Sequence, residues 1–352
     1  MGIEQILTVA AGLAASDVFI VAGLPISLKI NNKIERYGEE ILTPDDTDKA
    51  IQELYMLGQR NLESVMRGGD DDFSFSIVGI SRYRVSVYRQ RGSLAAVVRV
   101  IAFELPNPCS LGIPETVLKL SNEKKGLVLV TGPAGSGKST TLACMADRIN
   151  KTRNAHVITL EDPIEYLHKH NKSIISQREI VTDTQSYAVA LRAALRQSPD
   201  VILLGEMQDC ETMSVALTAA ETGHLVISTL YTTGAVNTID RLIDAFPPSR
   251  QGQIRVQLSM VLQAVISQQL VETVSGRAVP AFEVMMCNAA IREMIHEAKT
   301  QQIDDEIAAS EAEGMITMDA SLLRLCEKKK ITPEAAILYS MDTDLMKKKL
   351  NK

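Results

Sequence analysis

The residues most suited to chemistry form the run GPAGSGKS, from Gly132 to Ser139, which fits the phosphate-binding pattern G-x4-G-K-[ST]. An apolar stretch with strand character precedes it and a stretch with helical character follows it, which is the context that this pattern needs. Glycines let successive backbone N–H groups curl around an anion at a helix N-terminus, where the partial positive charge favours phosphate. The candidate phosphate-binding residues are Gly132, Pro133, Ala134, Gly135, Ser136, Gly137, Lys138, Ser139 and Thr140.

Two side chains of this run have separate tasks in such a loop. Lys138 would reach the β- and γ-phosphates of ATP, and the hydroxyl of Ser139 would ligate Mg²⁺. We therefore predict ATP and Mg²⁺ as cofactors, with Ser139 as the metal ligand.

A phosphate loop also needs a carboxylate that positions Mg²⁺ and the attacking water. The apolar run 201–204 passes through Gly205 into Glu206, so Glu206 would emerge at the carboxyl end of a buried strand, where open α/β sheets bind ligands. We interpret Glu206 as the general base. Position 205 lacks the Asp of the commonest second acidic motif, so Mg²⁺ would depend more on Ser139 and water.

Another acidic cluster follows the strand-like run 157–160. Glu161 comes first, and Asp162 and Glu165 follow closely. Carboxylates at a strand end could order water around Mg²⁺, while Asp162 could instead cap the next turn. Glu161 is our candidate catalytic residue in this cluster.

His224 precedes the apolar run 225–230. We expect it at the same edge of the sheet as Glu206, where it could sense or contact the γ-phosphate.

The elements that must position these residues alternate between short buried strands and helical patterns. Strands are predicted over 126–131, 157–161, 200–205 and 225–230, and a helix is predicted around 187–195, before Pro199. Such alternation predicts an α/β fold with a parallel sheet covered by helices. From about Ala281 onward the composition favours helix.

The chain divides into a smaller first part and a larger second part. Residues 1–105 predict a small α+β domain whose clearest strands, within 83–101, carry several arginines. Pro106, Asn107 and Pro108 then break regular structure. We predict a linker over 106–114 and the ATP-binding domain over 115–352.

Composition narrows the class of protein. Among 352 residues, 37 Lys and Arg against 43 Asp and Glu give a net charge of −6, which argues against a protein that coats nucleic acid. Five scattered cysteines support neither a disulfide framework nor a CxxC zinc site, and they favour a reducing cytoplasm. No apolar run approaches the ~18 residues of a membrane span, so we expect membrane contact only through partners.

Taken together, the motifs resemble the type IV pilus retraction ATPases of the secretion ATPase superfamily. The resemblance covers nearly the whole chain, and its further motifs are Ala15-Ser16-Asp17, Thr159 to Glu165, Gly205-Glu206-Met207-Gln208-Asp209, Thr222-Gly223-His224-Leu225-Val226, Thr238-Ile239-Asp240-Arg241 before Phe246-Pro247, and Ala290 to Glu297.

This resemblance implies a PAS-like N-terminal domain, a RecA-like P-loop NTPase domain and a hexameric ring with ATP between subunits. It also implies that arginines of the first domain reach the nucleotide when the domains close. Arg84 and Arg99 match the family's positions best, and Arg82 and Arg91 match less well. The implied partner is an inner-membrane platform protein of the pilus, and the implied location is the cytoplasmic face of that membrane.

The chain also departs from the family pattern. Gln208 and Tyr231 replace an Arg and a His, and in the last motif Glu293 replaces Asn and His296 replaces Arg. Gln cannot supply a guanidinium fork, and Tyr cannot titrate as imidazole does.

Other readings remain open on the residues alone. A catalytically weak ATP-binding regulatory subunit of a pilus or secretion machine would account for Gln208 and Tyr231. A DNA translocase shares the P-loop and the ring-shaped assembly, but it requires basic or aromatic loops that face the channel. An extension ATPase would normally carry a tetracysteine insert, and a GTPase would need an N-K-x-D motif; neither is present.

Overall fold

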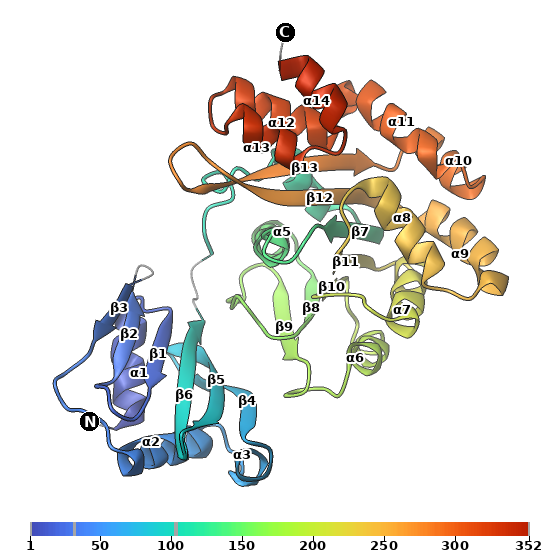
Figure 1. Ribbon diagram of the computed structural model, residues 1–352. Coiled ribbons are helices and arrows are strands. Elements are labelled where there is room, and N and C mark those ends of the chain that lie inside the picture. Colours follow the sequence, from blue (N-terminus) through green and yellow to red (C-terminus); the bar gives the residue numbers. More distant parts are fainter. Residues whose placement is uncertain (1, 31–32, 102–104, 351–352) are drawn as a thin grey trace. The chain divides into compact units, whose positions relative to one another are not determined.

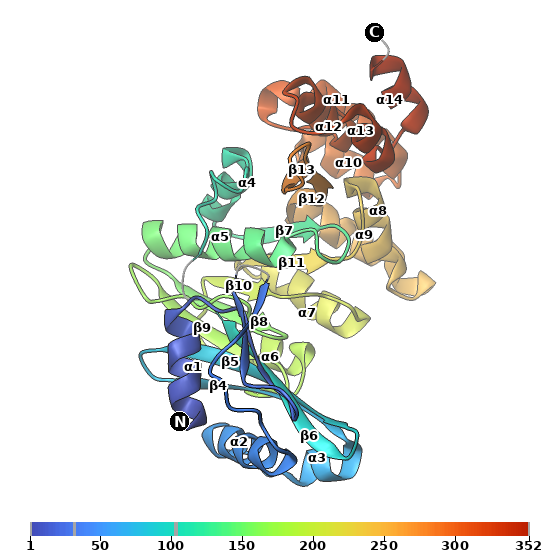
Figure 2. The ribbon, with the colours of Figure 1, turned by 60° about the vertical axis from the view of Figure 1, so that its left-hand side comes forward.

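The computed structural model describes residues 2–30, 33–101 and 105–350, and its elements are labelled in Figure 1 and seen from a second direction in Figure 2. Contacts divide the chain into two units: Met1–Glu104 with Glu165–Leu167, and Leu105–Ile164 with His168–Lys352. Each unit has its own hydrophobic core. Within the described ranges, no helix combines the length and apolar character that crossing a membrane requires.

The N-terminal unit is an antiparallel sheet with helices, as the α+β prediction requires. Its strand order is β3-β2-β1-β6-β5-β4. Its core includes Leu7, Leu54 and Val85, each fully buried. The elements are α1 (Ile3–Gly12), β1 (Asp17–Ile20), β2 (Ser27–Ile30), β3 (Lys33–Arg36), α2 (Pro44–Leu57), α3 (Glu63–Gly68), β4 (Asp70–Ile77), β5 (Ser81–Gln90) and β6 (Ser93–Ile101).

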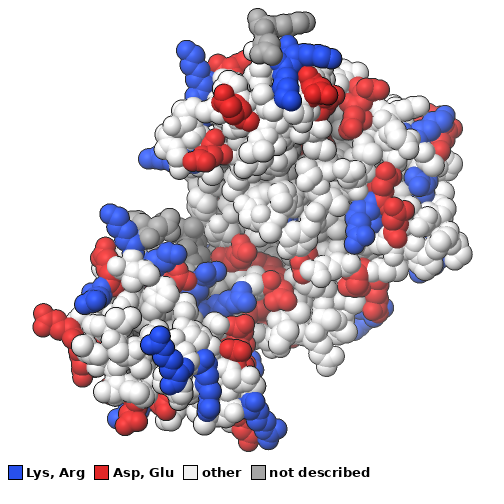
Figure 3. All heavy atoms as spheres, in the orientation of Figure 1, with Lys and Arg blue, Asp and Glu red and all other residues white. Residues whose placement is uncertain are grey.

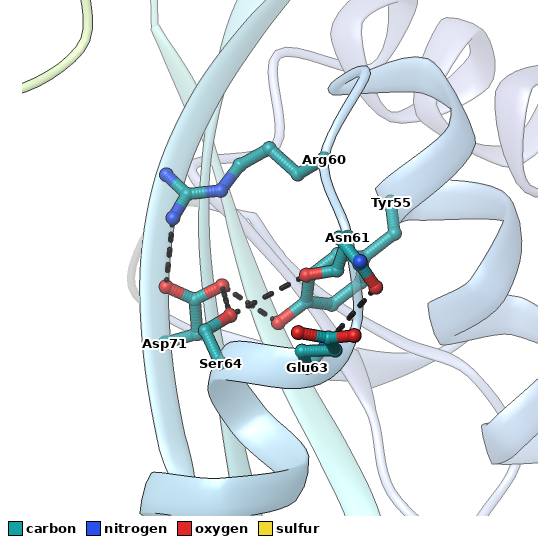
Figure 4. Close-up of polar contacts among 6 residues, drawn as sticks. All are labelled: Tyr55, Arg60, Asn61, Glu63, Ser64 and Asp71. Carbon is teal, nitrogen blue, oxygen red and sulfur yellow. Dashed lines mark hydrogen bonds and ion pairs between the residues drawn. The ribbon is translucent and has the colours of Figure 1, made fainter.

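One carboxylate ties α2, α3 and β4 together, as Figure 4 shows. Asp71 accepts hydrogen bonds from the hydroxyls of Tyr55 at 2.8 Å and Ser64 at 2.6 Å, and the guanidinium of Arg60 lies 3.2 Å from its other oxygen. Burial, together with the neighbouring Asp71, raises the pKa of Tyr55 to about 12. The phenol therefore stays a neutral donor, and this corner of the unit is held by side-chain hydrogen bonds.

The larger unit is built on a sheet with the strand order β13-β12-β7-β11-β10-β8-β9. Neighbouring strands from β12 to β9 are parallel, and β13 pairs antiparallel with β12. The strands are β7 (Gly126–Thr131), β8 (His156–Glu161), β9 (Ile174–Glu179), β10 (Val201–Leu204), β11 (Leu225–Leu230), β12 (Leu262–Glu272) and β13 (Ala278–Met286). The predicted parallel sheet and α/β class are confirmed.

Both faces of this sheet are buried. Along β7, Leu127 and Leu129 belong to one apolar cluster while Val128 and Val130 belong to another. Because alternate side chains point to opposite faces, helices must cover both sides. These helices are α4 (Glu115–Lys119), the 3₁₀ turn η1 (Leu120–Asn122), α5 (Lys138–Thr152), α6 (Tyr187–Ala194), α7 (Cys210–Glu221), α8 (Ala235–Asp244) and α9 (Pro248–Val261).

The expectation of helix from about Ala281 is wrong for the first residues of that stretch. Positions 281–286 belong to β13, where Phe282 and Val284 are buried against the sheet. Here pairing with β12 overrides the local composition. The elements that follow are α10 (Ala289–His296), η2 (Thr300–Gln302), α11 (Ile303–Ala309), η3 (Glu311–Glu313), α12 (Met318–Glu327), α13 (Pro333–Tyr339) and α14 (Thr343–Leu350).

Because the central strands are parallel, the sheet has two chemically different edges. We call the edge at which β7, β11, β10 and β8 end the carboxyl edge, and the edge at which they begin the amino edge.

Candidate active site

The glycine-rich loop joins the end of β7 to the first residue of α5 at the carboxyl edge (Figure 1). Gly132, Gly135 and Gly137 have φ values of +142°, +75° and +89°, a range that residues with a Cβ rarely adopt. The first N–H groups of α5 lack partners within the helix, so this turn forms an anion-binding concavity.

Lys138 lies over its own loop. Its Nζ donates to the carbonyl oxygens of Gly132 at 2.9 Å and Pro133 at 2.8 Å, and it lies 4.3 Å from the centre of the Tyr231 ring. The lysine is only 7% exposed. Carbonyl oxygens and an aromatic face are favourable partners for a buried ammonium, and here they hold it beside the loop that is expected to receive phosphate.

The remaining loop residues differ in access. Positions 133–135 are exposed, and Ser136 is buried with a hydroxyl that finds no hydrogen-bond partner in the described chain. Ser139 is exposed in the first turn of α5, and Thr140 is half-buried. The exposed Ser139 hydroxyl is a hard oxygen donor of the kind that Mg²⁺ takes.

Glu206 follows β10 at the same edge. The N–H of Gly205 donates to the Leu160 carbonyl at 2.7 Å, and the Gly205 carbonyl accepts from the Thr229 hydroxyl at 2.5 Å. These bonds fix the turn between the ends of β8 and β11. Glu206 is half-buried, and its Oε1 accepts a hydrogen bond from Gln208 at 2.8 Å.

Glu161 is the last residue of β8, the strand that neighbours β10. Its Oε1 accepts from the Thr159 hydroxyl at 2.6 Å and from Gln177 Nε2 at 3.2 Å. Register pairs Leu160 with Leu204, so Glu161 and Glu206 leave adjacent strands at the same edge.

Tyr187, the first residue of α6, was not among the predicted site residues. Its hydroxyl lies so close to Gly205 that a Cβ there would be 2.8 Å away. Burial, followed by the charges of Glu206, Asp162 and Glu161, raises its pKa. The structure thus adds a neutral hydrogen-bond donor beside the two carboxylates. In the sequence, the helical spacing of Tyr187 predicted only that its side chain packs against the sheet.

The expected placement of His224 is wrong. His224 lies between α7 and the first residue of β11, whereas the glycine-rich loop follows the last residue of β7. Since β7 and β11 are parallel neighbours, a residue before β11 lies at the amino edge. Its Nδ1 is 3.0 Å from the Ala219 carbonyl oxygen, and this contact joins the helix end to the strand. Tyr231 follows the last residue of β11 and therefore lies at the carboxyl edge.

The amino edge around His224 is hollowed, with a cavity of about 490 Å³. Lys124, Arg153 and Asp200 line it together with His224. Arg153 donates to the carbonyl oxygens of Ser121 at 3.0 Å and Glu123 at 2.8 Å. Arg153 therefore connects the end of α5 to the segment before β7.

Residues 3–313 match the family model described as type II/IV secretion system protein. The chain belongs to this family. It is 42% identical to the type IV pilus retraction ATPase PilT of Pseudomonas aeruginosa, over 96% of this chain and 97% of that protein. It is 46% identical to a twitching motility protein of Neisseria gonorrhoeae, over 82% of this chain and 75% of that protein.

A crystal structure of the pilus retraction motor PilT with bound ADP is 45% identical to this secretion-system protein. It superposes with a TM-score of 0.88, covering 99% of both chains. Its match extends through both units, so the predicted architecture of an N-terminal domain and a RecA-like domain is confirmed. The matches support an ATPase that uses a nucleotide and works as a pilus retraction motor.

Two of this family member's departures meet at the carboxyl edge. Gln208 bonds to Glu206, and Tyr231 covers Lys138. A neutral amide and a phenol therefore contact the two residues on which the predicted chemistry depends.

The candidate arginines lie in the N-terminal unit, on β5 and β6. Arg84 and Arg99 are direct cross-strand partners, and Arg99 pairs on its other side with Asp17, whose Oδ1 is 3.1 Å from its Nε. Arg84 is half-buried, and the Arg99 side chain is 67% exposed. Like charges placed opposite each other cost stability, and the Asp17 carboxylate offsets the charge of Arg99. Over the face drawn in Figure 3, basic and acidic side chains are mixed.

Proposed function

We propose that the chain is a Mg²⁺-dependent ATPase motor of type IV pilus retraction. The observation that carries this is the meeting of the glycine-rich loop, Lys138 and Glu206 at one edge of a parallel sheet, in a chain related to PilT over nearly its whole length. In this proposal six copies form a ring on the cytoplasmic face of the inner membrane. The ring acts on a membrane platform protein of the pilus, and it contacts neither lipid nor nucleic acid directly.

The phosphates would lie in the loop formed by residues 132–140. Lys138 would hold the β- and γ-phosphates, and Ser139 would ligate Mg²⁺. When bound, the metal supplies positive charge that neutralises the phosphate oxygens. Its fit rests on the exposed Ser139 hydroxyl and on the two carboxylates of the same edge.

Glu206 would act as general base. Its carboxylate would accept a proton from the water whose oxygen attacks the γ-phosphorus, while the bond to the β-phosphate oxygen breaks. Glu161 would orient that water. Hydrogen bonds from Gln208 to Glu206 and from Thr159 to Glu161 hold both carboxylates in place.

The proposal divides the chain into a PAS-like domain over 1–105, a linker over 106–114 and a RecA-like ATPase domain over 115–352. Arg84 and Arg99 would reach the transferring phosphoryl group when domains close around ATP, and they would stabilise its charge only then. Hydrolysis would thereby depend on movement. In this scheme His224 holds the end of α7 beside the start of β11 at the amino edge, and it does not contact the phosphates of its own subunit.

A second candidate function is an ATP-binding subunit that turns over slowly. Gln208 and the Tyr231 ring over Lys138 favour it. Steady-state ATPase rates of the purified chain beside Glu206→Gln decide between the two. A motor loses about 10²–10⁴-fold in kcat, whereas equal rates would support the regulatory subunit.

A second experiment tests the motor role itself. Expressed in a Pseudomonas aeruginosa strain that lacks PilT, the chain should restore twitching, and Glu206→Gln should not. Absence of twitching despite an active, correctly expressed ATPase would contradict the assignment to retraction.

A further inference from the structure

The strand β12 extends past the end of β7 and runs beside the glycine-rich loop. Register pairs Ser267 of β12 with Thr131, the last residue of β7. Gln268 is the next residue along β12, and it therefore lies where the neighbouring strand has already turned into the loop. Gln268 is only 3% exposed.

Gln268 contacts both ends of the loop. Its backbone carbonyl oxygen lies so close to Gly132 that a Cβ on that glycine would be 2.1 Å away. Its side-chain Nε2 lies close to Gly137, the N-cap residue before α5, where an added Cβ would be 2.8 Å away. One residue thus bears on the first and last glycines of the loop.

The other half of the side-chain amide holds the helix. Gln268 Oε1 accepts a hydrogen bond of 2.7 Å from the hydroxyl of Thr141, which is fully buried in the first turn of α5. A buried hydroxyl left without an acceptor is costly, so this bond fixes the start of α5 relative to β12.

We propose that Gln268 is a positioning residue for the nucleotide: it holds the loop and the first turn of α5 in the arrangement that presents their N–H groups to phosphate. This inference rests on the proposed ATPase function. The position requires a neutral side chain that accepts from Thr141 and fits beneath Gly137. A Glu retains the acceptor but adds negative charge behind an anion-binding loop.

The test uses the full chain and measures Mg·ADP affinity together with kcat and KM for ATP. Gln268→Glu should weaken ADP binding and raise KM at least tenfold at pH 8, with a smaller fall in kcat. Its deficit relative to the unchanged protein should shrink as the pH is lowered, because protonation makes the new side chain neutral. A residue that served packing alone would not produce this pH-dependent ratio.

Gln269 provides the matched control. It is the adjacent glutamine of β12, it is also buried, and its Nε2 donates to the Tyr339 carbonyl at 3.3 Å, away from the loop. Gln269→Met should leave ADP affinity and KM within twofold. An equal deficit in this variant, or ADP affinity within twofold for Gln268→Glu at pH 8, would overturn the inference.

Thr141→Val covers the case in which Gln268→Glu does not fold. It removes the same hydrogen bond but keeps the glutamine, and it should raise KM at least threefold; an unchanged KM overturns the inference. A chain whose own ADP binding cannot be detected would overturn the proposed function as well, whereas normal binding with unaffected variants would overturn the role of Gln268 alone.

Discussion

The two edges of the parallel sheet carry similar kinds of residue with different partners. At the carboxyl edge, Lys138 and Glu206 follow strands and lie beside a concave glycine loop. At the amino edge, Arg153 and His224 precede strands. Their side chains contact backbone carbonyl oxygens, and these contacts connect loops to helix ends. The difference shows that the place of a residue before or after a parallel strand decides whether it can reach the nucleotide.

The largest effect should come from the carboxyl edge. Lys138→Ala removes the cation that faces the β- and γ-phosphates, so ATPase activity should fall below detection and Mg·ADP affinity at least 100-fold. Lys151→Ala, on the exposed end of the same helix, is the control and should change neither. Turnover by Lys138→Ala at the normal rate would remove the carboxyl edge from the chemistry.

Arg99→Ala tests whether the residues of the carboxyl edge are sufficient for hydrolysis without an arginine from the N-terminal unit. If this arginine stabilises charge only in the closed state, the variant should bind ADP within twofold of normal and hydrolyse ATP at least 100-fold more slowly. Arg67→Ala, an exposed arginine of α3, is the control. Unchanged turnover in the oligomer would exclude Arg99.

A buried carboxyl behind the carboxyl edge should make the stability of this region depend on pH. Glu283 accepts hydrogen bonds from the N–H groups of Ala235 at 2.7 Å and Met318 at 3.3 Å, which begin α8 and α12. Burial raises its pKa from 4.5 to about 7. Between these values the folded chain binds more protons than the unfolded chain, so stability falls as pH rises through the window, by about 3 kcal/mol in total.

Urea unfolding at pH 4.5 and pH 8 measures this loss, and Glu283→Gln should abolish the Glu283 contribution. Glu272→Gln, an exposed residue at the end of β12, should retain it. Equal pH dependence in all three proteins would show that Glu283 does not titrate in this range.

The smallest effect on nucleotide affinity should come from a substitution at the amino edge. His224→Ala should leave Mg·ADP affinity within twofold, because the side chain lies across the sheet from the loop. Loss of its contact with Ala219 should lower the free energy of unfolding by about 1 kcal/mol, which urea unfolding would detect. A tenfold loss of ADP affinity would contradict the separation of the two edges.

Much of the fold followed from local pattern. Apolar runs of strand length predicted 126–131 and 225–230, and these coincide with β7 and β11. Phe282 and Val284 show where local pattern was insufficient, since their composition favoured helix while pairing with β12 made them strand. Secondary structure at that point depends on a partner that is distant in sequence.

By itself, the sequence determined the phosphate loop and the carboxylate after β10, because glycine spacing and the order of strand and residue are local properties of the chain. Only the tertiary structure decided that His224 lies at the opposite edge, that the Tyr187 hydroxyl meets Gly205, and that Gln268 supports the loop from β12. These relations depend on which strands become neighbours and in which direction they run. No periodicity within one segment encodes a contact between residues that are more than 100 positions apart, such as Thr141 and Gln268.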